Sequence, residues 1–350
     1  MSPTRAISFR ILTDVQQGGY ASDLLRRDTA GMQPRDAALV ESIVFGCLRR
    51  RSQLDFLISH FSGKPARHLD PEVRLALHIG IFQLRYLDRI PAHAAVAESV
   101  ELVKAARKRS AAGFVNAVLR KVTRDPVQWP DLATELSLPA WLFARWEARY
   151  GTAAAEAVAR AALDEPEAYR NAVTGRQQDI GAQSIVPLLE IEPGMTVLDL
   201  CAAPGNKTAQ ALAAGGVVVA CDRYLRRLKE VPEQALRVAL DATRALPFGR
   251  VFDRILLDAP CSGTGTLARN PEIKWRLQES DLAPFAERQR AMVGVALAHL
   301  KPGGRLVYST CSLEPEENEQ VAAGFSVRQS QMRLPGREPG DGFFAAVITP

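Results

Sequence analysis

The sequence has few cysteines and no long apolar run. Its five cysteines in 350 residues show no Cys-x-x-Cys spacing, which argues against a disulfide framework and a zinc knuckle. No stretch approaches the ~18 consecutive apolar residues of a membrane span. The N-terminus MSPTRAISFR lacks the apolar core and cleavage site of a signal peptide. Internal repeats and low-complexity segments are missing too. We therefore expect a cytoplasmic protein with reduced thiols and no metal site.

The length and composition predict a folded chain of two domains. With 350 residues, 47% hydrophobic and 24% charged, it exceeds the ~100 to 200 residues of one common domain. Residues 1–130 hold 20 Lys and Arg against 12 Asp and Glu, whereas the remainder holds 24 against 27. The basic clusters at 49–51 and 107–109 suit phosphate contacts, although such runs also occur on solvated helix faces.

The two halves of the chain differ in their apolar pattern. From residue 5 to about 122, apolar residues recur at helical spacing, as in Val40, Ile43 and Cys47. Prolines interrupt the pattern between 125 and 139, before helices predicted at 140–150 and up to 163. We assign residues 1–130 to an all-α domain, 131–178 to connecting helices and 179–350 to an α/β domain.

After residue 179 short β-branched and apolar runs replace the helical spacing. The predicted strands cover residues 196–200, 217–221, 238–240, 255–257, 306–308 and 343–348. Helical stretches separate most of them. This alternation predicts an open, mainly parallel sheet of the Rossmann type.

A small-residue turn follows the first predicted strand. Short side chains let a ligand approach the backbone, and the helix that follows offers free N–H groups. The candidate ligand-binding residues of this turn are Cys201, Ala202, Ala203, Pro204, Gly205, Asn206 and Lys207. The pattern is typical of a nucleotide-type binding turn.

Acidic residues end the strands that follow. Asp222 ends the second strand, where a carboxylate accepts hydrogen bonds from ribose hydroxyls; capping of a helix is the alternative role. Asp241 and Asp258 follow the next two strands. Because ligands of open α/β sheets bind at the carboxyl ends of strands, these acids point to one crevice.

Two cysteines also follow strand ends. Cys261 lies in the turn APCSGTG and Cys311 in STCSLE, both polar turns in which a thiolate can meet a substrate. Cys47 and Cys221 lie within apolar segments, and we interpret them as buried structural residues.

These strings resemble a known family. DLCAAPGNKT, LLDAPCSGTG and VYSTCSLEPEEN are similar to motifs of the Sun family of S-adenosylmethionine-dependent RNA cytosine-carbon-5 methyltransferases. The helical part, with RDAALVESIVFGCLRRR and FVNAVLRKV, resembles the NusB antitermination-factor fold. The pairing is similar to that of bacterial 16S rRNA methyltransferases, and it covers nearly the whole chain.

The resemblance implies a mechanism and roles for single residues. Cys311 would add to carbon-6 of cytosine, and Cys261 would assist release of the product. Asp258 and Lys207 would hold the cytosine edge. The turn from Cys201 to Lys207, with Asp222, Asp241 and Asp258, would bind S-adenosyl-L-methionine. The implied partner is 16S rRNA or a small-subunit assembly intermediate, with no DNA or membrane partner, and the protein would act as a monomer.

Three features depart from the family pattern. Asn206 replaces a glycine, the interval from Asp222 to Asp241 is short, and only a short stretch separates Pro166 from Asp179 where the family carries an RNA-recognition lobe. Two alternatives therefore stay open: a tRNA methyltransferase of the same mechanism, and an inactive rRNA-binding assembly factor. In an inactive assembly factor, neither thiol would have a chemical reason to be retained.

Overall fold

The computed structural model describes residues 2–350 and divides the chain into two units. Residues 2–164 and the segment Asn270–Trp275 form the first unit, which we call the helical unit. Glu165–Arg269 and Arg276–Pro350 form the second, the α/β unit. The domain boundaries that the sequence predicts at residues 130 and 178 remain predictions. No helix within residues 2–350 is long and apolar enough to cross a membrane.

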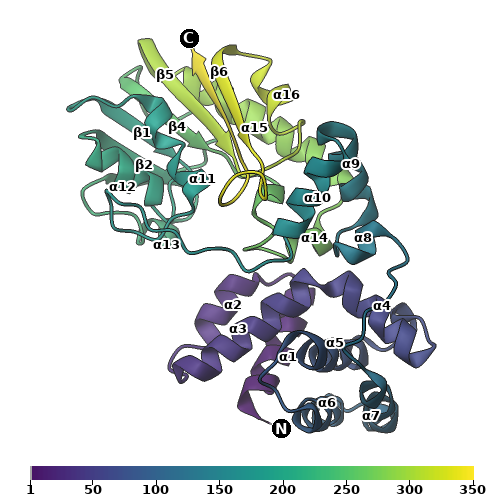
Figure 1. Ribbon diagram of the computed structural model, residues 1–350. Helices are drawn as coiled ribbons and strands as arrows, with labels where there is room; N and C mark the ends of the chain where they lie inside the picture. Colours follow the sequence, from purple (N-terminus) through teal and green to yellow (C-terminus); the bar gives the residue numbers. More distant parts are fainter. Residues whose placement is uncertain (1) are drawn as a thin grey trace. The chain divides into compact units, whose positions relative to one another are not determined.

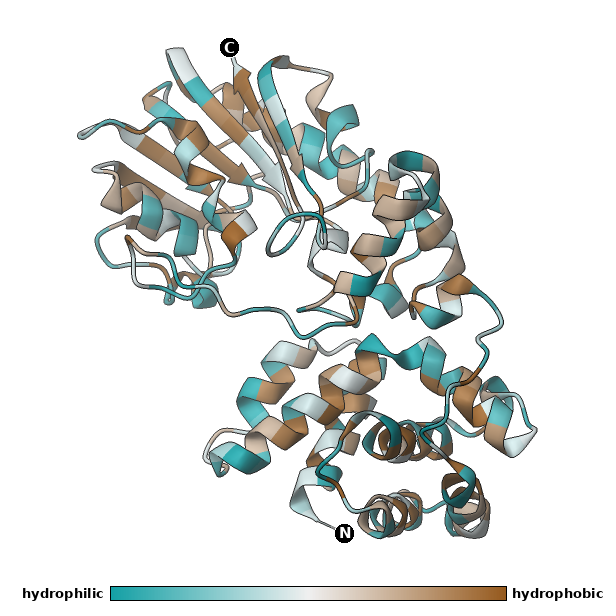
Figure 2. Cartoon of the chain, in the orientation of Figure 1, coloured by the Kyte–Doolittle hydropathy of each residue, from teal (hydrophilic) through white to brown (hydrophobic). Residues whose placement is uncertain are grey.

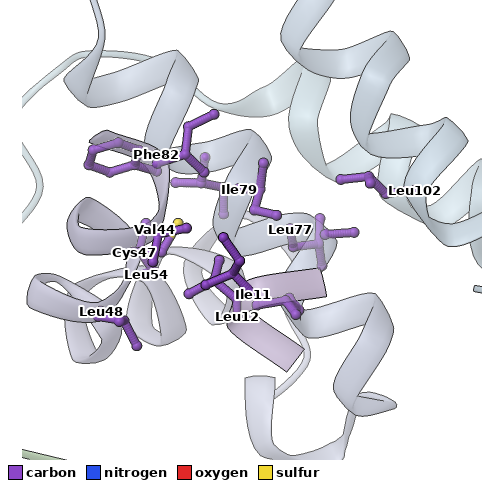
Figure 3. Packing of buried hydrophobic residues seen from close by; sticks show 14 of the residues in the cluster. Ile11, Leu12, Val44, Cys47, Leu48, Leu54, Leu77, Ile79, Phe82 and Leu102 are labelled. Carbon is purple, nitrogen blue, oxygen red and sulfur yellow. The ribbon is translucent and has the colours of Figure 1, made fainter. Parts of the chain in front are cut away.

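The helical unit confirms the predicted all-α architecture, apart from short 3-10 turns (Figure 1). Its α-helices are α1 (Pro3–Gln16), α2 (Ala21–Asp28), α3 (Pro34–Arg49), α4 (Arg51–Ser62), α5 (Pro71–Tyr86), α6 (Ala92–Ala105), α7 (Ala112–Lys121), α8 (Leu132–Glu135), α9 (Ala140–Tyr150) and α10 (Thr152–Ala161). Proline opens three of them, where its missing N–H costs nothing. The apolar stripes meet in one core that includes Ile11, Val44 and Leu77 (Figure 3).

A six-residue segment from far along the chain completes the helical unit. Within Asn270–Trp275, Lys274 is 1% exposed, and its Nζ donates to the carbonyl of Arg49 at 2.8 Å. The indole of Trp275 donates to the Leu48 carbonyl at 2.7 Å. Burial, together with the charges of Arg49 and Arg50, holds the pKa of Lys274 well below its usual value. The segment is therefore an integral part of the unit.

The predicted basic cluster at residues 49–51 packs against aromatic rings. Its three guanidinium groups lie 4.7 to 5.4 Å from the ring centroids of Phe45, Tyr86 and Trp275. Cation–π contacts therefore engage these arginines within the fold, which reduces their freedom to bind phosphates.

The α/β unit is built on a seven-stranded sheet in the order β3-β2-β1-β4-β5-β7-β6 (Figure 1). Its strands are β1 (Thr196–Leu200), β2 (Val217–Asp222), β3 (Leu236–Ala239), β4 (Phe252–Asp258), β5 (Leu300–Thr310), β6 (Ser326–Arg333) and β7 (Phe343–Thr349). The first five are parallel, and β7 pairs antiparallel with both β5 and β6. The structure thus confirms a mainly parallel Rossmann-like sheet.

Short and long helices surround the sheet and are joined to it by apolar contacts. The α-helices of this unit are α11 (Ile180–Gln183), α12 (Asn206–Ala213), α13 (Leu225–Leu228), α15 (Leu282–Leu297) and α16 (Glu319–Ala322), while α14 (Ile273–Arg276) spans the boundary with the helical unit. Two apolar clusters include alternate residues of β1: Leu198 and Leu200 in one, Val197 in the other. Figure 2 shows the apolar character of β7 next to the more polar β6.

The sequence prediction missed β6. Val327 and Met332 are the only apolar residues in the strand SVRQSQMR, and most of its side chains are exposed. It lies at the edge of the sheet, so its backbone pairing with β7 determines its structure. The short interval from Asp222 to Asp241 corresponds to α13, which has only four residues.

Candidate active site

A cavity of about 130 Å³ opens where β1 and β4 end. The residues that line it are Gln178, Asp179, Ala182, Asp199, Cys201, Ala202, Ala203, Pro204, Asn206, Lys207 and Asp258. Seven of these lining residues were predicted as site residues. Six of the seven belong to the turn after β1, and the seventh is Asp258. The parallel register of β1 and β4 brings the ends of these strands together.

The turn after β1 depends on an unusual backbone conformation. Gly205 has φ +95° and precedes α12, and a Cβ there would lie 2.7 Å from Val231 Cα. Only glycine tolerates both the left-handed backbone and this close approach. Cys201 also has a positive φ, of 65°, and the Ala202 N–H donates to the carbonyl of Cys221 at 2.8 Å. The turn is therefore pinned to β2.

Asp199 lies in β1 beneath the cavity. Its side chain is 1% exposed, and Oδ2 accepts a 2.6 Å hydrogen bond from the Thr208 hydroxyl. The other oxygen, Oδ1, is buried and has no hydrogen-bond partner. Burial raises the pKa of Asp199 from 3.8 to about 7. A buried carboxylate with a free acceptor is suited to a cationic or hydrogen-bond-donating ligand.

Lys207 and Asp258 form an ion pair at the cavity. Lys207 Nζ lies 2.7 Å from Asp258 Oδ2, and Ser309 Oγ donates to the other carboxylate oxygen at 2.8 Å. Burial lowers the pKa of Lys207, but the attraction of Asp258 outweighs this and leaves it raised. The ammonium group also lies 5.2 Å from the ring centroid of Phe343, a contact that the sequence prediction did not include.

The two predicted catalytic cysteines meet in space. Cys261 follows β4, Cys311 follows β5, and their Sγ atoms are 3.3 Å apart. The N–H of Gly265 donates to the Cys311 carbonyl at 2.8 Å, which joins the two turns. The hydrogen bond to Cys311, together with burial and nearby negative charge that includes Glu317, raises the pKa of Cys261 well above its usual value.

Glu317 is a site-supporting residue that sequence reasoning missed. It is fully buried, and its carboxylate accepts hydrogen bonds from the Ser262 N–H and hydroxyl, from Ser312 Oγ at 2.5 Å and from Gln289 Nε2 at 2.9 Å. Ser262 and Ser312 each follow one of the two predicted catalytic cysteines in sequence. One carboxylate therefore holds both cysteine turns. The string EPEEN was the available signal, but an acidic run usually indicates a solvated surface.

Asp222 and Asp241 do not line this cavity. Asp222 ends β2, accepts from the Tyr224 N–H at 2.9 Å and lies 3.2 Å from Arg227 Nη1. Asp241 lies two residues beyond β3 and accepts from the N–H and hydroxyl of Thr243, which lower its pKa. Their roles in ligand binding stay predictions.

The remaining cysteines are embedded in the fold. Cys47 and Cys221 are buried, and burial raises the pKa of Cys221 to about 12. Burial also raises the pKa of Cys201, so this thiol contributes to the turn as a neutral group. Within residues 2–350 no three His, Cys, Asp or Glu side chains are grouped in a way that could hold a metal ion.

Comparisons with known proteins agree with this geometry. The family described as "16S rRNA methyltransferase RsmB/F" matches residues 186–339, and the NusB family matches residues 2–124. Proteins named "Ribosomal RNA small subunit methyltransferase B" from Klebsiella pneumoniae subsp. pneumoniae and from Escherichia coli strain SMS-3-5 are each 34% identical, over 95% of both chains. The crystal structure of PH0851 superposes with a TM-score of 0.80 at 20% identity, covering 100% of this chain and 99% of that one.

The alignments to these relatives extend over 411 positions, more than the 350 residues of this chain. The relatives therefore contain residues, within the aligned span, that this chain lacks.

The Rossmann-like sheet, with its binding turn at the end of β1, defines an S-adenosylmethionine-dependent methyltransferase. The chain belongs to the 16S rRNA methyltransferase RsmB/F family, with a NusB-type helical domain at its N-terminus. It is an enzyme that methylates RNA with S-adenosyl-L-methionine as its cofactor.

Proposed function

We propose that this enzyme methylates carbon-5 of a cytosine in 16S rRNA through a covalent bond to Cys311. The observation that carries the proposal is the pair of thiols 3.3 Å apart beside the Lys207–Asp258 ion pair. A poor carbon nucleophile such as carbon-5 needs prior addition at carbon-6, and this arrangement offers a nucleophile and a second thiol for that purpose. The same machinery argues against an inactive assembly factor.

The cavity residues fit the cofactor. Ala202 and Ala203 allow close approach to the backbone, and the buried Oδ1 of Asp199 offers an unpaired acceptor to a cationic ligand. We assign cofactor binding to the turn Cys201–Lys207 with Asp222, Asp241 and Asp258. When bound, the cofactor supplies an electrophilic methyl group on a sulfonium.

The surroundings of the two thiols differ and suggest their roles. Cys311 lies close to the Lys207 ammonium, which would stabilise the negative charge that develops on sulfur during attack. Cys261 faces Cys311 and the buried charge of Glu317, both of which raise its pKa. Cys261 therefore holds its proton at neutral pH and can donate it in a hydrogen bond to Cys311 Sγ, 3.3 Å away.

The proposed reaction begins with addition of Cys311 to carbon-6. The new C–S bond uses the sulfur lone pair, and the electrons of the carbon-5–carbon-6 double bond move to carbon-5, with Asp258 and Lys207 holding the ring edge where charge accumulates. Carbon-5, made nucleophilic in this way, would take the electrophilic methyl group that the bound cofactor supplies.

Release requires loss of the carbon-5 proton. Once Cys311 is bonded to carbon it carries no negative charge and is a weaker hydrogen-bond acceptor, so two of the causes that raise the pKa of Cys261 are removed, while burial and Glu317 remain. Cys261 gives its proton to solvent and, as a thiolate, takes the proton of carbon-5. The electron pair of the broken C–H bond re-forms the double bond between carbon-5 and carbon-6. The C–S bond then breaks, and its electrons return to Cys311 as a thiolate.

Single substitutions of the two cysteines test the mechanism. Cys311→Ala should abolish methyl transfer and form no protein–RNA adduct, whereas Cys261→Ala should leave enzyme joined to methylated RNA. The measurement is a denaturing gel with 16S rRNA and cofactor carrying a labelled methyl group. Adduct with Cys311→Ala but not with Cys261→Ala would exchange the roles, and normal turnover of both variants would exclude covalent catalysis.

The substrate assignment needs a separate measurement. Bisulfite sequencing of 16S rRNA and tRNA, from cells with and without the gene, should show one methylcytosine lost from 16S rRNA. Loss from tRNA instead would favour the tRNA alternative. We place the enzyme in the cytoplasm as a monomer with RNA, and not DNA, as its partner.

A further inference from the structure

The short stretch before Asp179 forms a β-hairpin with a well-defined turn. The N–H of Asn171 donates to the Arg176 carbonyl at 2.9 Å, and that of Gln178 donates to the Tyr169 carbonyl at 3.0 Å. The Asn171 side chain is 4% exposed, and its Oδ1 accepts from the N–H groups of residues 173 and 174 at 3.0 Å. This hairpin, residues 169–178, is therefore fixed by its own hydrogen bonds.

The hairpin bonds directly to the cofactor-binding turn. Arg176 Nε donates to Asn206 Oδ1 at 2.8 Å, and its Nη2 donates to the Pro204 carbonyl at 3.1 Å. Asn206 Nδ2 in return donates to the Gln177 carbonyl at 3.0 Å. The Asn206 side chain thus accepts from the Arg176 side chain and donates to the backbone of the next hairpin residue, and a glycine at position 206 would leave Arg176 without its side-chain acceptor.

A second contact connects the hairpin with helix α12. Gln178 is 6% exposed, and its Nε2 donates to Gln210 Oε1 at 2.6 Å. Gln178 and Asn206 both line the cavity. The hairpin therefore contacts the cavity wall at two places, through Gln178 and through its bonds to Asn206. It also holds the start of α12, whose N–H groups would face a bound ligand.

We propose that Arg176 and Asn206 are positioning residues that hold the turn in its cofactor-binding conformation. The proposal rests on the assignment of the cofactor to this turn. Ala202, Ala203 and Gly205 have no side chain that can anchor the turn, so beyond the Ala202 N–H bond to β2 its order depends on bonds to its carbonyls and to Asn206. A turn ordered before binding loses less conformational freedom when the ligand arrives, which strengthens affinity.

Arginine suits this role because its fork reaches two acceptors at once. Nε and Nη2 bind different residues of the turn, a geometry that a lysine ammonium on a flexible stem does not reproduce. A lysine at position 176 keeps the charge but loses the paired geometry. The substitution therefore separates electrostatic attraction of the cofactor from positioning of the turn.

The test is a double-mutant cycle on cofactor affinity in the full-length protein. Calorimetry with S-adenosylhomocysteine should show roughly tenfold weaker binding for both Arg176→Ala and Asn206→Ala, and no further loss in the double variant. Arg176→Lys should bind as weakly as Arg176→Ala. The KM for RNA should stay unchanged, because the pair acts on the cofactor turn alone.

Matched controls separate the possible outcomes. Arg170→Ala removes an arginine of the same hairpin whose guanidinium bonds only within the hairpin, to the Gly175 carbonyl, so its affinity should match the wild type. Asp222→Ala should weaken cofactor binding because it removes the predicted contact between Asp222 and the cofactor. Unchanged affinity in both pair variants with a loss in Asp222→Ala would overturn the positioning role, as would additive losses. Unchanged affinity in all three would instead overturn the cofactor assignment itself.

Discussion

A single buried carboxylate makes the stability of this protein sensitive to pH. Asp199 has one satisfied oxygen and one buried oxygen without a partner, and burial raises its pKa from 3.8 to about 7. Between pH 3.8 and about 7, Asp199 is therefore protonated in the folded state but ionised in the unfolded chain. Stability must then fall as pH rises through that window.

We expect the free energy of unfolding without cofactor to decrease between pH 5 and pH 7.5. For a shift of this size the contribution of Asp199 over its whole titration is on the order of 4 kcal/mol. Asp341, whose pKa burial and Asp179 raise to about 7, adds a similar contribution. Urea unfolding of Asp199→Asn at both pH values should show a smaller decrease. If the free energy of unfolding of Asp199→Asn decreased with pH as steeply as that of the wild type, the assignment of this pH dependence to Asp199 would be contradicted.

At the scale of elements, Glu317 joins the turns after β4 and β5, in addition to the bond from Gly265 to Cys311. Glu317 receives donors from Ser262, Ser312 and Gln289, the last of which lies on α15. These donors converge on a carboxylate with no exposure to solvent. An unmade hydrogen bond to a buried charged group is costly, so the arrangement of both cysteines depends on this residue.

We expect Glu317→Gln to lower methyl transfer about tenfold or more while cofactor affinity stays unchanged. The amide offers one acceptor oxygen in place of two and places N–H groups against serine hydroxyls that now donate. The measurement is single-turnover methylation beside calorimetry with S-adenosylhomocysteine. Glu287→Gln, an exposed acid on the same helix as Gln289, is the matched control and should behave like the wild type. Equal loss of cofactor affinity would mean that Glu317 supports the whole unit rather than the thiols.

Sequence reasoning succeeded where the pattern itself carries the physics. β1 was predicted with its observed bounds because its valine and two leucines form a short apolar segment, interrupted only by Asp199 and ended by a turn. β6 was missed because an exposed edge strand has no such pattern. Glu317 was missed for a related reason: its burial follows from partners more than 25 residues away in sequence, at Ser262 and Gln289, which no local pattern reveals.

At the scale of the molecule, the helical unit is not continuous in sequence. Asn270–Trp275 belongs to it, and this segment contributes a buried lysine and a half-buried tryptophan to its packing. A fragment cut at the end of the first 164 residues leaves out these groups. The carbonyls of Leu48 and Arg49, which accept hydrogen bonds from them, would then lose their partners.

We expect a fragment of residues 1–164 to be incompletely stable, and a synthetic peptide of residues 268–278 to stabilise it. A ligand that binds only the folded form raises the melting temperature with its concentration. Circular dichroism should show an increase of several degrees at saturating peptide. A peptide with Trp275→Ala and Lys274→Ala is the control and should have little effect. Equal melting temperatures with and without the authentic peptide would show that the segment is dispensable.

The discontinuity of the helical unit also bears on the order of events during synthesis. The first 164 residues leave the ribosome roughly 110 residues before the segment that completes their unit. At ~5 to 20 residues per second this delay is about 5 to 20 s. During that interval the amino-terminal helices must remain unfinished, with the docking place of Trp275 open to solvent. An rRNA-modifying enzyme built in this way completes its first-made unit only after most of the catalytic chain has been translated.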